Sequence, residues 1–284
     1  MPVYNAERWL VAGIESMQQQ SLADFELILS DNASTDGSLA IAERFARADK
    51  RIRILRQSRN LGANGNYSAV LADARADYFK WASVNDLCAP EFLQRCVEAL
   101  EKQPDAVLAY PRTIVFEKSP VDGALYEDDF AVSADDGVRR FIDLLERIKL
   151  NNAMNGVIRR KTLNRALRMG TFKSADYLLM AELALAGKYV LLDDALFYRR
   201  MSPEAATNCR GGLEAEKHLV PNATRPLLWQ HWRYHRRLLR VACRFAPFGF
   251  SSPAAVDFAL RRIFWSRSEL ADDVRAAFSR VVAN

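Results

Sequence analysis

Residues 1–120 alternate between strand-like and helix-like segments, and this alternation constrains the fold more than any other feature. The run Phe25–Ser30 is short and apolar and ends in Asp31 and Asn32, which is typical of a buried strand entering a turn. Strands that alternate with helices favour an α/β fold with a mostly parallel, Rossmann-like sheet flanked by helices on both faces. The other expected strands are Arg51–Leu55, Tyr78–Ser83, Ala106–Tyr110, Gly156–Arg159 and Lys188–Leu192. The expected helices are Ala6–Gln20, Thr35–Asp49, Asn64–Ala74, Pro90–Lys102, Asp136–Leu150 and Ser174–Gly187.

Two segments interrupt the alternation. Residues 119–134 include Asp122, Asp128 and Asp129, and we expect an exposed acidic loop there. Residues 201–226 are irregular and rich in Pro, Gly and Asn, and two or three helices are expected after them.

The composition excludes several classes of protein. Half of the residues are hydrophobic and 26% are charged, as in a soluble globular protein. No run approaches 18 apolar residues, and the N-terminus lacks the pattern of a secretory signal. The four cysteines, Cys88, Cys96, Cys209 and Cys243, have no CxxC spacing, so we expect neither a structural zinc site nor a disulfide framework. A reducing cytosol fits best.

Positive charge is concentrated at the end of the chain. Residues 225–284 contain eleven arginines and four acids, an excess of +7, so the rest of the chain carries −2 of the total of +5. This asymmetry predicts a separate electrostatic role for residues 225–284, against an anionic surface. A slightly acidic core without a recognition motif argues against nucleic-acid binding.

A first strand is also expected in the residues before Tyr4. Polar residues follow three of the expected strands: Tyr4 and Asn5, then Asp31 to Asp36, then Asn85 and Asp86. Ligands of open parallel sheets bind outside the carboxyl ends of the strands, so these groups can form one site. Taken singly, each group also fits a turn or a helix N-cap, where Asp, Asn and Ser are common.

Several motifs occur in an order that resembles the family-2 glycosyltransferases, and the resemblance covers about residues 1–202. It is most specific in the first hundred residues and absent beyond Pro226. The motifs are Met1–Asn5, Asp24–Asp36, Arg59–Gly62, Phe79–Ala82 and Leu87–Leu93.

The resemblance implies an A-type glycosyltransferase fold, in which a Rossmann-like sheet that binds a nucleotide-sugar precedes an acceptor-binding half. We therefore expect a catalytic domain over residues 1–224, with a nucleotide-sugar half at 1–118 and an acceptor half at 119–224. Residues 225–284 would then form a basic, aromatic helical extension.

The resemblance also assigns nucleotide-sugar-binding residues. Pro2, Tyr4 and Glu7 match the first-strand motif, whose Tyr packs on the nucleobase. Asp31 matches the acid that hydrogen-bonds the base, and Asn85 matches a position that faces the ribose or the donor sugar.

For the chemistry, the resemblance assigns Asp86 to binding Mg²⁺ or Mn²⁺ and Asp176 to the catalytic base. One carboxylate suffices in principle, because Mg²⁺ takes one or two carboxylates plus substrate phosphates. A positioned carboxylate can accept the proton of an attacking sugar hydroxyl. Without the resemblance, Asp176 also fits an acid in the first turn of a helix, stabilised by the helix dipole.

The sequence departs from the family pattern at three points. Asn85 stands where an acid is usual, and Ala175 replaces the acid that normally precedes the base. Met1 falls inside the first-strand motif, so we expect that strand residues which the family places before this Met are missing from the sequence.

The resulting hypothesis is an inverting glycosyltransferase that moves a sugar from a nucleotide-diphosphate sugar to a sugar or lipid-linked acceptor hydroxyl. Bacterial surface-polysaccharide or glycolipid synthesis is the expected setting. The alternative is a non-catalytic nucleotide-sugar-binding domain that lost activity with its acidic pair.

His231 and His235 are spaced i, i+4, but zinc needs three or four ligands, so solvated or interfacial histidines are expected.

Residues 225–284 leave two alternatives open. A basic helix with Trp and Phe can lie in the headgroup region of an anionic membrane, which would make the protein peripheral on the inner face. The same helices can instead pack on the catalytic domain, with arginine stems crossing apolar surface. The residues at issue include Trp229, Trp232, Leu238, Val241, Phe245, Phe248, Phe250, Phe264 and Trp265.

Overall fold

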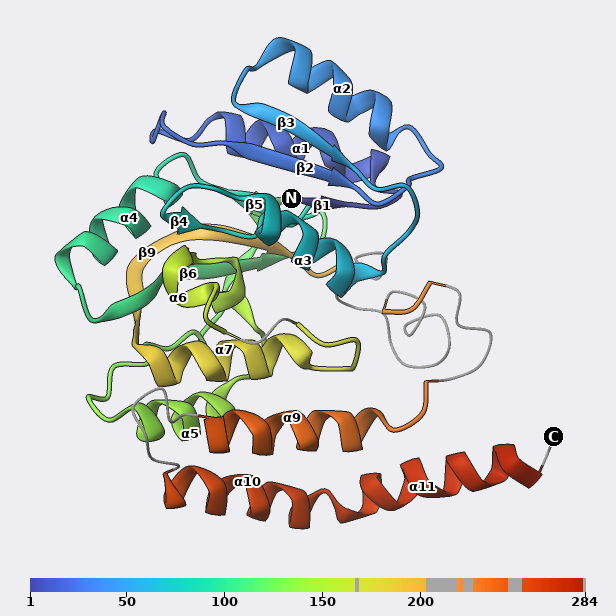
Figure 1. The fold of residues 1–284 in the computed structure, drawn as a ribbon. Helices are drawn as coiled ribbons and strands as arrows, with labels where there is room; N and C mark the ends of the chain where they lie inside the picture. The colour runs from blue at the N-terminus through green and yellow to red at the C-terminus, as the bar shows by residue number, and fades with distance from the viewer. Residues whose placement is uncertain (167–168, 203–218, 222–226, 245–251, 283–284) are drawn as a thin grey trace.

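A computed structural model gives the fold of the chain as two sheets with helices around them (Figure 1). The helices near the C-terminus stack on the side of the molecule that lies opposite α2 (Ser38–Ala48). The structure describes residues 1–166, 169–202, 219–221, 227–244 and 252–282. Cys209, Phe245, Phe248 and Phe250 lie outside the described residues.

The first sheet is parallel, as the alternation predicts. Its strands are β1 (Pro2–Val3), β2 (Leu27–Asp31) and β3 (Ile52–Arg56), and their order is β1-β2-β3. Every residue of β2 is buried, which is typical of a parallel strand covered on both faces. α1 (Glu7–Gln18) buries Leu10, Gly13, Ile14 and Met17.

The second sheet is mixed. Its order is β4-β8-β6-β9-β5, and β7 pairs with β6. β6 and β9 run parallel, whereas β4 and β6 pair antiparallel with β8, and β5 pairs antiparallel with β9. Its strands are β4 (Tyr78–Phe79), β5 (Leu87–Cys88), β6 (Ala106–Phe116), β7 (Ala124–Leu125), β8 (Val157–Arg159) and β9 (Lys188–Arg200). The α/β, Rossmann-like class is therefore confirmed, with antiparallel pairs added in this sheet.

The two long strands continue beyond their predicted ends. β6 does not stop at Tyr110, because the pairing of β6 with β9 shifts register at Pro111 and accommodates the proline. β9 does not stop at Leu192, because Asp193 and Asp194 bulge out of the pairing and the strand then resumes. β4 is shorter than predicted, since residues 80–83 leave the sheet.

The helices lie close to their predicted positions. The remaining ones in residues 1–202 are α3 (Ala63–Asp73), α4 (Phe92–Lys102), η1 (Pro120–Asp122), α5 (Gly137–Arg147), η2 (Asn152–Asn155), α6 (Arg160–Leu163) and α7 (Ala175–Ala186). Asp136 caps α5 by accepting a hydrogen bond from the Arg139 amide over 2.7 Å. α7 is apolar on nearly all sides because it lies in the interior, between other helices and β6.

Three helices follow the described residues 219–221: α9 (Gln230–Arg244), α10 (Pro253–Trp265) and α11 (Arg267–Val282). The inner faces of α9 and α10 are part of the main hydrophobic core, where Leu238 and Val241 are buried and Phe258 meets Phe141 edge to face, whereas α11 packs on α9 and α10. Among the described residues, no helix combines the length and the hydropathy needed to cross a membrane.

The acidic segment 119–134 is only partly an exposed loop. Asp128 is exposed and pairs with Lys149, as expected. The prediction was wrong for Asp129, which is buried and accepts hydrogen bonds from the Thr113 amide over 2.7 Å and from Asn152 Nδ2 over 2.9 Å. Those two donors satisfy a carboxylate that water would otherwise solvate.

Candidate active site

Hydrogen bonds connect the loop that follows β1 with the loop that follows β2, at the carboxyl ends of both strands. The Ala6 amide donates to Ser38 Oγ over 2.8 Å, and the Thr35 amide donates to Asn5 Oδ1 over 2.8 Å. Glu7 Oε2 accepts from the Gly37 amide over 2.7 Å, at the residue before α2. The predicted residue Glu7 thus holds the loops together, and its carboxylate stabilises the start of a helix.

Tyr4 and Asp31 offer free groups at this edge. The Tyr4 side chain is 44% exposed. Asp31 is buried at the end of β2, where its Oδ2 accepts from the Ser34 amide over 3.3 Å and its Oδ1 has no partner among the described residues. Pro2 lies in β1 opposite Ser30 of β2. An exposed ring and an unpaired carboxylate oxygen at the ends of neighbouring strands are groups that could bind a nucleobase.

Asn32 connects this edge to α3. Its Oδ1 accepts from the Leu61 amide over 2.8 Å, and its Nδ2 donates to Asn60 Oδ1 over 2.8 Å. The chain then turns into α3 through Gly62, whose φ of 75° is readily available only to glycine. The end of β2 therefore sets the position of the first turn of α3.

The segment Val84–Asp86 packs directly against α1. A Cβ atom on Gly13 would lie 2.7 Å from the Val84 carbonyl oxygen, so only glycine fits the helix at this crossing. α1 thereby fixes the backbone that presents Asn85 and Asp86.

Asn85 and Asp86 are both buried. Asn85 Oδ1 accepts from Ser83 Oγ over 2.6 Å, and Asp86 Oδ1 accepts from the Arg200 amide over 2.9 Å. Burial raises the pKa of the Asp86 carboxyl, while the Arg200 amide and the positive charge of Arg199 act in the opposite direction.

Arg200 packs against the segment Val84–Asp86. Its guanidinium donates to the Asn85 carbonyl over 3.2 Å and lies 4.2 Å from the Trp9 ring and 4.5 Å from the Phe116 ring. Burial lowers the pKa of Arg200. The hydrogen bonds and the two aromatic faces compensate for burying its charge.

Asp176 lies in the first turn of α7. Its Oδ2 accepts from Asn151 Nδ2 over 2.8 Å. Burial raises the pKa of Asp176, and the hydrogen bond from Asn151 opposes this shift. A carboxylate with a raised pKa is a stronger base than one in water, and it suits proton abstraction.

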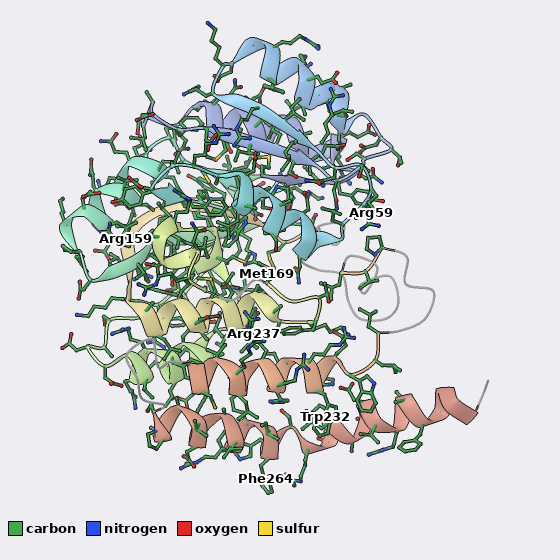
Figure 2. All side chains as sticks on the ribbon, viewed as in Figure 1. Arg59, Arg159, Met169, Trp232, Arg237 and Phe264 are labelled. Atoms are coloured by element: carbon green, nitrogen blue, oxygen red, sulfur yellow. The ribbon has the colours of Figure 1, made fainter. Side chains whose placement is uncertain are left out.

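Asp86 and Asp176 line one cavity of about 330 Å³ together with Arg199. The wall consists of the start of α3, the segment Ser83–Asp86, the segment Asn151–Asn155 and the end of β9. Met169, labelled in Figure 2, also contributes. Asn85 is adjacent to Asp86, whereas Pro2, Tyr4, Glu7 and Asp31 lie outside this cavity, at the ends of β1 and β2. A compartment with two acids and one arginine can hold a charged ligand and move a proton.

A larger cavity of about 380 Å³ lies at the opposite end of β2. Apolar side chains such as Met17, Leu27 and Val70 line it, beside the Met1 amine, which donates to the Ile28 carbonyl over 2.7 Å. Burial and the charge of Lys80 lower the pKa of this amine to about 5. The cavity faces the amino ends of the strands, and its lining includes the charged residues Asp24, Glu26, Asp77 and Lys80 but neither Asp86 nor Asp176.

Asp86 and Asp176 are the carboxylates among the described residues that line the 330 Å³ cavity. No group of three or more His, Cys, Asp or Glu side chains that could hold a metal ion occurs in the described part of the chain.

His231 contacts Asp273 over 3.3 Å, and burial lowers the pKa of His235. Cys88, Cys96 and Cys243 are free thiols.

Sequence reasoning missed Asn151, Arg199 and Arg200. The two arginines follow the apolar run Ala195–Tyr198, but the strand was expected to end at Leu192, so the sequence did not place them on it. Asn151 carries no signal of a site, because Asn is common in loops.

The chain is similar in sequence to known glycosyltransferases. The putative glycosyltransferase EpsE of Bacillus subtilis is 36% identical over 125 residues, which are 44% of this chain and 45% of that protein. An uncharacterised glycosyltransferase of Haemophilus influenzae is 29% identical over 126 residues, 44% of this chain and 39% of that protein. The matches span less than half of the length of these relatives.

Two solved structures share the fold. S. aureus TarS residues 1–349 in complex with UDP-GlcNAc has a TM-score of 0.61 and 15% identity, over 96% of this chain and 77% of that one. The mannosyltransferase PcManGT of Pyrobaculum calidifontis, in complex with GDP-Man and Mn²⁺, has a TM-score of 0.52 and 13% identity, over 99% and 79%.

The sequence profile described as glycosyl transferase family 2 matches residues 1–166, which is more than half of the chain. The polar edge of the first sheet and both wall segments that carry Asp86 and Asn151 fall inside this match. The chain belongs to glycosyl transferase family 2.

Proposed function

We propose that the protein is an inverting glycosyltransferase that moves a sugar from a nucleotide-diphosphate sugar to an acceptor hydroxyl. The observation that carries this proposal is that Asp86 and Asp176 line the same cavity. Residues 1–118 bind the donor, residues 119–224 form the acceptor half, and residues 225–284 are the basic, aromatic extension.

The donor occupies the edge of the first sheet and reaches into the cavity. Tyr4 stacks on the nucleobase and Asp31 Oδ1 accepts a hydrogen bond from it, supported by the exposure of that ring and the missing partner of that oxygen. Pro2 and Glu7 shape the loop around Tyr4, and Asn85 faces the ribose or the donor sugar.

Asp86 fits a divalent cation. A single carboxylate is an adequate protein ligand for Mg²⁺ or Mn²⁺ when phosphate oxygens and water complete the shell. When bound, such an ion would offset the negative charge on the leaving diphosphate. The Arg200 amide, which donates to Asp86 Oδ1, keeps this carboxylate aimed at the cavity.

Asp176 accepts the proton of the attacking hydroxyl. The acceptor oxygen bonds to the anomeric carbon, the bond from that carbon to the diphosphate oxygen breaks, and its electron pair leaves with the nucleotide. Attack from the face opposite the diphosphate inverts the anomeric configuration. Asn151 orients Asp176, and the raised pKa of this carboxyl strengthens it as a base.

The titles of the similar structures suggest donors to test. TarS was solved with UDP-GlcNAc and PcManGT with GDP-Man and Mn²⁺. Because the relatives from Bacillus and Haemophilus are bacterial glycosyltransferases, we place the reaction in bacterial surface-polysaccharide or glycolipid synthesis, with a sugar or lipid-linked acceptor.

We also propose that the protein works in the cytoplasm, on the inner face of the membrane. The inner face of α10 is packed on the core, but Leu260, Phe264 and Trp265 on its outer face are 53%, 63% and 61% exposed. Phe278 of α11 is 67% exposed, and Figure 2 shows Phe264 pointing away from the body of the protein. With the +7 excess of residues 225–284, this face suits an anionic bilayer.

A thermal-shift panel of UDP-, GDP- and dTDP-sugars with Mn²⁺ identifies the donor. A ligand at 100 times its Kd stabilises the folded state by about 2.7 kcal/mol. Hydrolysis of the stabilising donor is then measured without acceptor. Slow release of free sugar supports an enzyme, whereas binding without any release supports the non-catalytic domain. No stabilisation by any donor would contradict both.

A further inference from the structure

Arg199 is a buried cation that has no charged partner among the residues that the structure describes. It is 9% exposed at the end of β9 and lines the 330 Å³ cavity. Within the described part of the chain, no carboxylate lies within 4.0 Å of its guanidinium, and its Nε has no hydrogen-bond partner. A buried charge is normally paired, because removing it from water is costly.

A chain of buried polar groups holds Arg199 in place. Arg199 Nη1 donates to Asn152 Oδ1 over 2.7 Å, and Asn152 Nδ2 donates to Asp129 Oδ1 over 2.9 Å. The other oxygen of Asp129 accepts from the Thr113 amide over 2.7 Å. Because an ionised carboxylate only accepts, Asp129 turns the NH₂ group of Asn152 toward itself and the amide oxygen toward Arg199.

This arrangement leaves the guanidinium fixed but not neutralised. Asn152 presents a neutral oxygen to Arg199, so the positive charge is retained, and one face of the cavity stays cationic. Asp86 and Asp176 line the same cavity but form no ion pair with Arg199.

We propose that Arg199, positioned by Asn152 and Asp129, binds the diphosphate of the donor and stabilises its charge as the nucleotide leaves. This inference rests on the proposed donor site. A guanidinium presents several N–H donors in a fixed plane and matches phosphate oxygens in two-point contacts. Arg199 therefore supplies from the protein part of the positive charge that the leaving group needs.

The test uses the full-length protein and the nucleotide that stabilises it best among UDP, GDP and dTDP. Binding of that nucleoside diphosphate and of the matching uncharged nucleoside is measured by calorimetry with Mn²⁺ present. Arg199→Gln should lower affinity for the diphosphate by roughly 10- to 100-fold and leave affinity for the nucleoside unchanged. The ratio of the two affinities is measured on one sample, so partial unfolding cannot imitate the result.

Further variants test whether the charge and geometry of Arg199, and its positioning by Asp129, determine the affinity for the diphosphate. Arg199→Lys keeps the charge but loses the planar geometry, so it should restore part of the ratio. Asp129→Asn should lower the ratio several-fold, because Asp129 accepts with both oxygens, from Asn152 and from the Thr113 amide, and an Asn side chain has one acceptor oxygen. Asp128→Asn is the matched control, since Asp128 is exposed, pairs with Lys149 and lies outside the chain of contacts.

The outcomes are distinct. An unchanged ratio in Arg199→Gln overturns the role of Arg199 while the proposed function stands. A lowered ratio in Arg199→Gln with an unchanged ratio in Asp129→Asn overturns the positioning role of Asp129. If no nucleotide binds the wild-type protein, the proposed function fails, and this inference fails with it.

Discussion

The backbone amide of Arg200 donates a hydrogen bond to Asp86 Oδ1 over 2.9 Å, so the last residue of β9 fixes a carboxylate that lies just before β5. These strands are neighbours in the sheet but far apart in the chain. The proposed metal ligand is thus oriented by the acceptor half of the protein, although it acts on the donor.

Asp86→Ala should remove the metal dependence of donor binding without unfolding the protein. Asp86 makes the proposed contact to the cation, and its loss leaves the cavity without that ligand. Calorimetry with Mn²⁺ and with EDTA measures the effect. Asp194→Ala is the control, because Asp194 pairs with Arg95 at the surface. Equal Mn²⁺-dependent affinity in Asp86→Ala and wild type would reject the assignment.

Asp176→Asn should lower transfer by about 10²–10⁴-fold and keep donor affinity, because general-base catalysis contributes on that scale. An amide fills the same space but cannot accept the hydroxyl proton. Single-turnover transfer and donor titration, performed on the same preparation, check the two halves of the prediction. Near-normal transfer would exclude Asp176 as the base.

The same substitution should raise stability at neutral pH. Burial raises the pKa of Asp176, so the ionised form is costly in the folded state, and that cost grows as pH rises through the folded pKa. Below the pKa of an unfolded Asp, about 4, both states are protonated and the cost disappears. The Tm of Asp176→Asn should exceed that of the wild type at pH 7, and the difference should close toward pH 4. A pH-independent difference would contradict the burial effect.

Gly13→Ala should displace the segment that carries Asp86. Helix propensity alone would make this change stabilising by about 1 kcal/mol, so a lowered Tm would reveal the clash with the Val84 carbonyl. Mn²⁺-dependent donor affinity should fall as well. Gly65→Ala is the comparison, because its added Cβ atom would lie 2.8 Å from the Leu61 Cβ atom, a clash of similar size that does not involve the segment Val84–Asp86. If Gly13→Ala is more stable and binds donor normally, α1 does not position this segment.

Phe264→Ser combined with Trp265→Ser should abolish sedimentation with anionic liposomes while leaving donor binding intact. Both side chains are exposed, and each buried aromatic side chain contributes to interfacial binding. Wild-type binding should need anionic lipid and weaken with salt, because the attraction fades within about 8 Å at physiological ionic strength. Val121→Ser, at an exposed apolar residue on η1, is the control. Equal sedimentation of all proteins would reject membrane docking.

The liposome experiment needs point substitutions, because truncation at Pro226 would remove more than the exposed side chains Phe264 and Trp265. Leu238 and Val241 belong to the main core, so removing α9 would expose it. The sequence left two alternatives open for residues 225–284. The inner faces of α9 and α10 pack on the domain, as the second alternative expects. The membrane alternative therefore concerns only the exposed outer face of α10 and α11.

Local sequence pattern predicted most elements, and the resemblance to the family assigned roles to two of the cavity residues. Asp86 follows a predicted strand and Asp176 begins a predicted helix, so both could be located without knowing how the strands pair. Arg199 and Arg200 could not be placed, because Asp193 and Asp194 interrupt the apolar pattern of β9 and the bulge that absorbs them depends on pairing with β6. Asp129 was misplaced for a similar reason, since its burial depends on the distant Thr113 and Asn152.

The path of β9 limits how parts of this protein can be exchanged with those of its relatives. β9 runs beside β6, pairs with β5 at Leu87 and Cys88, and ends in the arginines that face and support Asp86. In a chimera that takes its acceptor half from another glycosyltransferase, the residue that hydrogen-bonds Asp86 in place of Arg200 would come from the other protein. Grafting a new acceptor preference should therefore succeed only when β9 is inherited from the chain that supplies the donor half.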